Sequence, residues 1–296
     1  MNAPTTHHSA NTSKEAQFLA PETHPRADEG KDFVSILQEA LTEPGIVNAA
    51  YRAFKNFSLG NQMLAAMQLR AKGLPLSPIA SFNAWREKGR CVVKGQKAIS
   101  LYMPVSVKRR EKAGAAIEAT PSAGDTSEEG GATFSMFMLR ANWFSLDQTE
   151  GEDFAPELCT PSWDCATALA VLDITETPFA LVSGNVLGYA RGRTIAINPL
   201  NPLKHKTRFH ELAHVALGHT TEGDMSDTPE TPRDTREVEA EGVAYLLCTL
   251  LDLPGLAESR DYLQGWLAGQ AVSEKSARKI FGAADRIMKA GQPVQH

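Results

Sequence analysis

The stretch His-Glu-Leu-Ala-His at residues 210–214 constrains this 296-residue chain more than any other. Residues four apart lie on one face of an α-helix, one turn from each other. The imidazoles of His210 and His214 can therefore bind one metal ion at about 2.0–2.1 Å, and zinc is the expected ion, with other divalent metals as alternatives. Glu211 is then the candidate catalytic acid/base, next to a metal-bound water. The alternative interpretation is an ordinary helix with two surface histidines.

A second helix is expected to supply the third metal ligand, because catalytic zinc usually has three protein ligands and an open position. Residues 236–245 place acidic side chains in an otherwise apolar helix, where an unpaired charge is costly. We predict a His₂Glu site with Glu239 as the third ligand and Glu241 as the second choice. The remaining carboxylates are expected to orient the imidazoles. His219 is a weaker candidate, since it follows His214 without a glycine-turn pattern.

The residues before the motif offer less specific candidates. A strand expected at 194–197 is either the sheet edge along which a peptide pairs or an ordinary core strand. Tyr189 and Arg191 are candidates for stabilising an oxyanion, although nothing in the sequence singles them out.

Charge is distributed unevenly along the chain. Residues 31–112 hold 14 Lys and Arg against 5 Asp and Glu, a net charge of +9. Residues 145–296 hold 13 Lys and Arg against 22 Asp and Glu, a net charge of −9, whereas the whole chain carries only −5. This asymmetry indicates a polyanion-binding module joined to a second, different domain.

Basic and aromatic residues alternate within the positively charged segment. Single-stranded nucleic acid binding needs cations along the backbone and exposed aromatic faces for stacking. The candidate DNA-binding residues are Phe82, Trp85, Arg86, Lys88, Arg90, Lys94, Lys97, Lys108, Arg109 and Arg110. Weaker candidates are Lys55, Asn61, Gln62, Arg140 and Trp143. The alternative is a solvated basic surface with Phe82 and Trp85 in the core.

The pattern of elements predicts an α+β protein of two domains, each with its own core. We expect a disordered tail at 1–30, a basic mixed helix/sheet domain at 31–150 with a mobile loop at 111–132, and a second domain at 151–296. The second domain is expected to open with a helix at Thr160-Pro161, followed by strands at 179–182, 186–189 and 194–197. Helices are then expected at about 204–218, 234–251 and 273–290.

Composition also limits the setting in which the chain acts. No apolar run reaches about 18 residues, so no membrane span is expected. The four cysteines are scattered and form no CxxC pair, which indicates neither disulfides nor a cysteine metal cluster and fits the cytoplasm.

Two motif blocks resemble a known family. The segments 81–97 (Ser-Phe-Asn-Ala-Trp-Arg-Glu-Lys-Gly to Val-Lys-Gly-Gln-Lys) and 143–151 resemble the N-terminal domain of ArdC-type antirestriction proteins, which TraC-type plasmid primases share. The His-Glu-Leu-Ala-His motif with the later Glu-Ala-Glu at 239–241 is similar to the ImmA/IrrE peptidases, and more distantly to SprT-like proteases. The resemblance implies a zincin-like second domain in which His210, His214 and Glu239 fall on the ligand positions.

The resemblance also implies a function. Such proteins are carried by conjugative plasmids, bind incoming single-stranded DNA and protect it from the recipient's restriction endonucleases. A protein substrate or a component of the restriction enzyme is a further expected partner of a zinc metallopeptidase site. Two alternatives stay open: a DNA-coating protein with a purely structural metal, and a regulatory metallopeptidase whose basic half binds an acidic protein.

Overall fold

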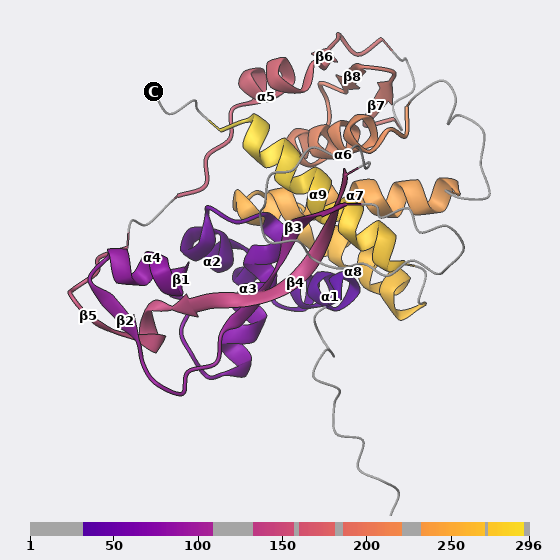
Figure 1. The fold of residues 1–296 in the computed structure, drawn as a ribbon. Coiled ribbons are helices and arrows are strands. Elements are labelled where there is room, and N and C mark those ends of the chain that lie inside the picture. The colour runs from indigo at the N-terminus through magenta and orange to yellow at the C-terminus, as the bar shows by residue number, and fades with distance from the viewer. Residues whose placement is uncertain are drawn as a thin grey trace, which may run out of the picture.

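The structure, a computed structural model, describes residues 32–108, 133–156, 160–180, 186–220, 232–269 and 272–292. The predicted tail at 1–30 and the predicted loop at 111–132 lie outside these ranges. Among the described helices, none is both long enough and apolar enough to cross a bilayer. The described part of the chain combines helices with three small sheets (Figure 1), so the expected α+β class is confirmed.

The N-terminal half begins with three helices and continues with strands around one short helix. Asp32 caps the first helix, since its Oδ1 accepts a hydrogen bond from the Ser35 amide at 2.9 Å. The elements are α1 (Phe33–Thr42), α2 (Pro44–Phe54), α3 (Leu59–Ala71), β1 (Ile79–Ser81), α4 (Phe82–Glu87), β2 (Arg90–Val92), β3 (Ile99–Lys108), β4 (Thr133–Ser145), the 3₁₀ turn η1 (Leu146–Gln148) and β5 (Thr149–Gly151).

The strands of this half pair over long sequence distances. Strands β1, β4 and β3 form one antiparallel sheet in that order, and β2 pairs with β5 in a second. Residues 94–97, with Lys94 and Lys97, lie between β2 and β3 and are called the basic turn below. Each of these two strands finds its partner after residue 132. The end of β4 and the start of β5 thus fix the position of the basic turn.

Helix α3 covers the edge of β3 with two amide side chains. Asn61 donates to the Tyr102 carbonyl at 2.9 Å and accepts from the Tyr102 amide at 2.8 Å. Gln68, two helical turns later, forms the equivalent pair with Ser100 at 2.8 and 2.9 Å. The backbone groups that β3 would otherwise leave unpaired at its edge are therefore satisfied. Asn61, a weaker candidate for DNA contact, has a structural role instead.

The C-terminal half places a three-stranded sheet beside a group of helices. Its elements are α5 (Cys165–Leu172), β6 (Thr175–Glu176), β7 (Gly188–Arg191), β8 (Thr194–Ile197), α6 (Lys204–Leu217), α7 (Arg233–Leu250), α8 (Leu256–Ala268) and α9 (Glu274–Ala290). The sheet order is β6-β8-β7, with β6 parallel and β7 antiparallel to β8. The predicted helices at 204–218, 234–251 and 273–290 are confirmed within two residues.

Several boundaries differ from the sequence-based expectation. The first helix of this half begins at Cys165 and not at Pro161, because Asp164 caps it by accepting from the Thr167 amide at 2.8 Å. A strand at 175–176 forms where none was expected, and residues 179–180 are not part of a strand. The rest of the strand expected at 179–182 lies outside the described residues.

The two halves share one continuous buried core. Buried side chains of α1–α3 and of α6–α9 form a single hydrophobic cluster, and in Figure 1 the long helices α7 and α9 lie beside the N-terminal helices. Polar contacts cross the same boundary: Asn48 donates to the Leu250 carbonyl at 3.0 Å, and the Leu59 amide donates to Asp285 at 3.1 Å. The expectation of a separate core for each half therefore differs from the structure.

We predict that Gln68→Leu destabilises the protein by about 1–3 kcal/mol, because it leaves the backbone groups of Ser100 without their partner. Urea unfolding measures the change. Gln38→Leu, at an exposed position of α1, is the matched control and should stay within about 0.5 kcal/mol of the parent. Equal losses in both variants would rule out the edge-covering role.

Candidate functional site

Two asparagine turns lead from the sheet into α6. Asn198 Oδ1 accepts from the Leu200 amide at 2.9 Å, and Asn201 Oδ1 accepts from the Leu203 amide at 2.8 Å. Asn201 also donates to Thr207 Oγ1 at 2.7 Å, which ties this turn to the first turns of α6. Asparagine favours such turns because its side chain hydrogen-bonds to the backbone two residues on. The start of α6 is thus fixed relative to β8.

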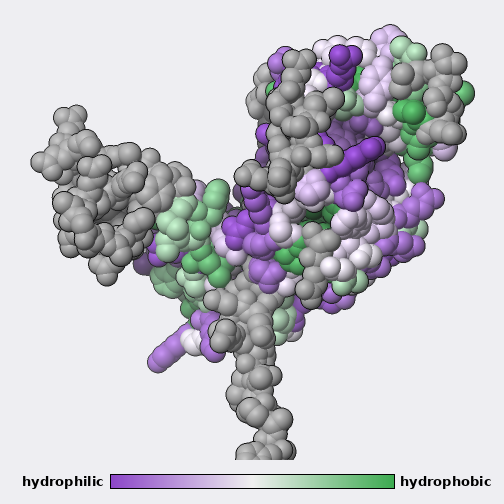
Figure 2. All heavy atoms as spheres, turned by 90° about the vertical axis from the view of Figure 1, so that its right-hand side faces the viewer, coloured by the Kyte–Doolittle hydropathy of each residue, from purple (hydrophilic) through white to green (hydrophobic). Residues whose placement is uncertain are grey.

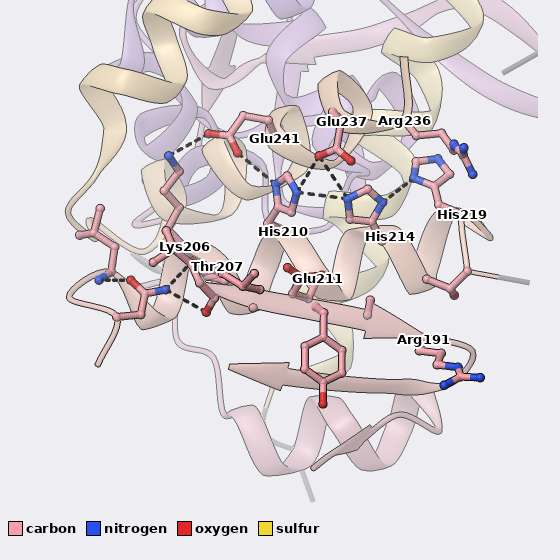
Figure 3. A pocket seen from close by; sticks show the side chains of 18 of the residues that line it. Arg191, Lys206, Thr207, His210, Glu211, His214, His219, Arg236, Glu237 and Glu241 are labelled. Atoms are coloured by element: carbon pink, nitrogen blue, oxygen red, sulfur yellow. Dashed lines mark hydrogen bonds and ion pairs between the residues drawn. The ribbon is translucent and has the colours of Figure 1, made fainter. Parts of the chain in front are cut away.

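Helix α6 carries the histidine pair and packs against α7. The Nε2 atoms of His210 and His214 lie 3.1 Å apart. An oxygen of Glu237, on α7, lies 3.3 Å from His210 Nε2 and 3.7 Å from His214 Nε2. Ligand atoms of all three residues lie within 4.8 Å of one another, and Figure 3 shows them converging. Two imidazoles and one carboxylate in this arrangement match the donor set of a divalent metal site.

The structure brings Glu237, and not Glu239, to the histidine pair. Glu237 and Glu241 are four residues apart and share one face of α7, whereas Glu239 points to the opposite side. Glu239 is 1% exposed and accepts from His219 Nε2 at 3.1 Å and from Lys279 Nζ at 3.4 Å. The prediction of Glu239 as the third ligand therefore differs from the structure, because a ligand of an accessible metal must face the pocket.

The second-choice carboxylate, Glu241, lies behind the first histidine. Its Oε2 is 3.1 Å from His210 Nδ1, and its Oε1 pairs with Lys206 Nζ at 2.9 Å. This contact leaves Nε2 of His210 directed toward Glu237. The expectation that carboxylates outside the ligand set orient an imidazole thus agrees with the position of Glu241.

Burial and paired charges shift the pKa values of these groups. Burial acts to lower the pKa of His210, but the carboxylates of Glu237 and Glu241 outweigh it and raise this pKa to about 9. Burial lowers the pKa of His214. Hydrogen bonds from both histidines hold the pKa of Glu237 far below its usual range. For Glu241 burial opposes ionisation, yet its bonds to His210 and Lys206 lower the pKa to about 2. A metal entering here would displace the proton from His210.

Glu211 lies on the side of α6 that faces the sheet, beneath the two histidines (Figure 3). It is 8% exposed, and burial raises its pKa to about 7, in spite of the opposing charge of His210. A carboxyl group with a pKa near neutrality is suited to accept and return a proton. Gly188 on β7 permits this placement, since a Cβ there would lie 3.1 Å from Glu211 Oε1 and 2.6 Å from Thr207 Cγ2.

A pocket of about 1450 Å³ opens onto the histidines. Strand β7 lines one side of it, and residues of α6 and α7 line the others. Figure 2 shows the face with α7 and α8, where hydrophilic side chains surround a hollow below the lobe that carries the sheet. Tyr189 and Arg191, the oxyanion candidates, both line this pocket. The strand at 194–197 is central in the sheet, so the edge strand along the pocket is β7.

The structure removes two candidates from the predicted DNA surface. Trp85 is 1% exposed and donates from Nε1 to the Phe144 carbonyl at 2.8 Å, so its face cannot stack on a base. Arg90 is bound internally, with Nε 2.9 Å from Thr149 Oγ1 and a second donor 3.0 Å from the Thr149 carbonyl. Trp85 thus ties α4 to β4, Arg90 ties β2 to β5, and their prediction as DNA contacts is corrected accordingly.

The other described candidates remain at the surface. Phe82 is 44% exposed, and Arg86, Lys88, Lys94 and Lys97 are exposed. Lysine 72, which the sequence analysis did not select, donates to the carbonyls of Lys97 and Ala98 and braces the basic turn. Lys108 ends β3, and Arg109 and Arg110 lie outside the described residues. Of the weaker candidates, Gln62 and Trp143 are buried, whereas Lys55 and Arg140 are exposed.

Two family models match this chain in the order of its halves. The N-terminal domain of the anti-restriction factor ArdC matches residues 38–142, and the IrrE N-terminal-like domain, a peptidase family, matches residues 170–259. The chain belongs to the ArdC-type antirestriction proteins. The resemblance inferred from the motif blocks is therefore confirmed, and the C-terminal half of this ArdC-type chain is a metallopeptidase-like domain.

Solved structures of an ArdC protein resemble this one. The metal-free structure of antirestriction protein ArdC from plasmid R388 is 18% identical, covers 87% of this chain and 94% of its own, and has a TM-score of 0.50. The Mn(II)-bound structure of the R388 protein is 16% identical, covers 89% and 99%, and has a TM-score of 0.47. At 18% identity, the resemblance to the metal-free structure shows a shared fold. No curated protein matches the chain significantly.

We predict that Gly188→Ala destabilises the protein by about 1–3 kcal/mol, because the added methyl group overlaps the Thr207 side chain and crowds Glu211. Thermal unfolding measures the change. Gly45→Ala is the control, since a Cβ there meets nothing within 4 Å, and it should be neutral or stabilising by up to about 1 kcal/mol. A Gly188→Ala protein as stable as the parent would show that the strand does not need this close approach.

Proposed function

We propose that this protein binds single-stranded DNA through its basic N-terminal half and holds a divalent metal ion, with zinc as the expected ion, between His210, His214 and Glu237. The protein would protect incoming conjugative DNA from the restriction endonucleases of a recipient cell and act in its cytoplasm. The observation that carries the proposal is the convergence of three ligand atoms at the base of an open pocket, with Glu211 beside them.

The residues around the ligands support a hydrolytic site. A bound divalent ion supplies Lewis-acid activation of a water and of a carbonyl group. Glu211, with its pKa raised by burial, can take a proton from a water in the pocket and give it to a departing amine. Arg191 and Tyr189 on the pocket wall are suited to orient a carbonyl oxygen.

The edge strand suggests how a peptide would enter. Among the residues that the structure describes, strand β7 pairs with β8 alone, and residues 188–191 line the pocket next to Glu211. An extended peptide can add to such an edge through main-chain hydrogen bonds. A substrate on β7 would lie close to Glu211 and to the histidines of α6, which favours a protein substrate over a small molecule.

The basic turn supports the proposed DNA contact. Lys94 and Lys97 are exposed on this turn, and Lys72 donates hydrogen bonds to the backbone carbonyls at its end. Exposed Phe82, at the start of α4, offers an aromatic face in the same half. Cations with an accessible ring fit single strands without sequence preference. The rival with a purely structural metal makes the same DNA contact but needs no proton transfer by Glu211.

The ligand set predicts a clear difference between two glutamates in metal affinity. Glu237→Ala should lower the affinity for Zn²⁺ by more than about tenfold, whereas Glu211→Gln should leave it within roughly threefold of the parent. Competition with a chromophoric chelator measures both. A Glu237→Ala protein with parental affinity would remove Glu237 from the ligand set.

Protection against restriction then separates the two functional alternatives. If Glu211→Gln abolishes protection of transferred DNA while DNA binding is unchanged, the hypothesis that protection requires hydrolysis is supported. Unchanged protection in this variant would leave the DNA-coating protein with a structural metal as the better description.

The basic turn predicts salt-dependent binding. Binding of a labelled single-stranded oligonucleotide should exceed that of the matched duplex, and Lys94→Glu should reduce the slope of log K against log salt by about 0.7 for one lost phosphate contact. Fluorescence anisotropy across a salt series measures both. Lys275→Glu, on an exposed position of α9, is the control. Equal slopes for the two variants, or no binding at all, would contradict the proposed surface.

A further inference from the structure

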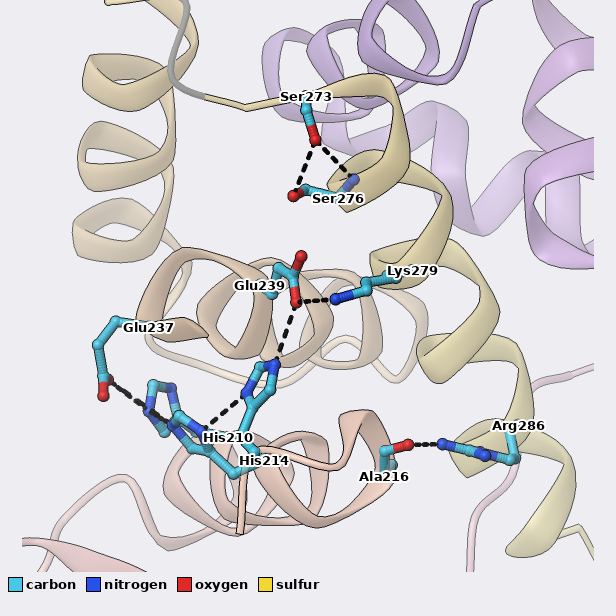
Figure 4. A network of polar contacts seen from close by, with 10 residues as sticks. His210, His214, Ala216, Glu237, Glu239, Ser273, Ser276, Lys279 and Arg286 are labelled. Carbon is cyan, nitrogen blue, oxygen red and sulfur yellow. Dashed lines mark hydrogen bonds and ion pairs between the residues drawn. The ribbon is translucent and has the colours of Figure 1, made fainter. Parts of the chain in front are cut away.

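A chain of buried polar contacts extends from His214 to helix α9. His214 Nδ1 lies 3.1 Å from His219 Nδ1, His219 Nε2 lies 3.1 Å from Glu239 Oε2, and the same oxygen lies 3.4 Å from Lys279 Nζ (Figure 4). The side chain of His219 is 4% exposed and that of Glu239 is 1% exposed. Buried polar groups this well paired are costly to disturb.

Local backbone geometry explains why His219 reaches this position. Helix α6 ends at Leu217, and Gly218 follows in the left-handed conformation with φ 80°. Glycine adopts this conformation without steric cost. The His219 amide then donates to the His214 carbonyl at 2.9 Å. The chain turns back at Gly218, and the ring of His219 comes to lie beside the ring of His214, 5.2 Å between centroids.

We propose that His219, Glu239 and Lys279 position His214 for metal binding and fix which of its nitrogens faces the metal. This inference rests on the proposed metal site. His214 Nε2 faces His210 and Glu237, so it must offer its lone pair there, and the proton must sit on Nδ1. His219 Nδ1 then accepts this hydrogen bond, and His219 carries its own proton on Nε2, which it donates to Glu239.

His210 is held by a shorter chain of polar contacts of the same kind. His210 Nδ1 contacts Glu241 directly, and Glu241 pairs with Lys206. Each metal-facing imidazole is thus backed by a carboxylate that a lysine neutralises. The difference is that a second imidazole, His219, spans the longer distance from His214 to its carboxylate. Partners behind metal-binding histidines typically change metal affinity by about 10–100-fold.

The test is Zn²⁺ affinity, measured by chelator competition on full-length protein. His219→Ala should lower the affinity about tenfold or more. His219→Gln should recover most of it, because an amide offers one acceptor and one donor at a spacing close to that of the two ring nitrogens. Lys279→Met should weaken binding by a smaller factor, and Lys275→Met, an exposed lysine on the same helix, should not change it.

A second measurement separates positioning from a merely structural role. Nuclear magnetic resonance of ¹⁵N-labelled histidine in the Zn²⁺-loaded protein should show His219 protonated on Nε2 and His214 protonated on Nδ1. Parental affinity in His219→Ala, or a His219 that is protonated on Nδ1, would overturn the inference while Glu237→Ala still reports on the metal site. If the parent protein binds no Zn²⁺, the proposed metal site itself fails.

Discussion

The crossing of α6 and α7 is the contact on which the rest of the site depends. Glu237, Glu239 and Glu241 of α7 each pair with an imidazole or a lysine. Glu239, the most buried of the three, would strongly destabilise the fold if its charge had no partner. Because Glu237 and Glu241 share one face and Glu239 takes the other, α7 can rotate little without breaking a contact. The helix crossing is therefore specified by polar pairs as well as by apolar packing.

Helix α9 connects this crossing to the N-terminal half. Lys279 reaches Glu239, while its neighbour Arg278 lies over the rings of Phe33 and Tyr102, at 4.8 and 5.1 Å from their centroids. Glu274, one turn earlier, accepts from the Phe33 amide at 2.7 Å and pairs with Arg278. One helix thus supports both the metal-facing polar chain and the start of α1. The two halves behave as one folded unit, although their charges and family models differ.

Patterns among neighbouring residues predicted three of the helices well, but they could not predict which distant strands pair. The apolar spacing that predicted α6, α7 and α9 is a property of neighbouring residues. By contrast, α8 fully buries only Ser259 and Leu263, and no helix was predicted at its position. The pairing of β2 with β5 joins residues about sixty positions apart, which local patterns do not encode.

At the candidate site, too, the sequence predicted the residues that are close along the chain but not those that depend on how two helices pack. The spacing of His210 and His214 fixes their common face, and Glu211 follows from the motif, so local sequence was enough there. The third carboxylate depends on how α7 meets α6. The acidic side chains in an apolar helix predicted a ligand on α7 without distinguishing its faces, and Glu239, the most buried of them, does not line the pocket. Helical spacing would have grouped Glu237 with Glu241, leaving the choice between them to the tertiary contact.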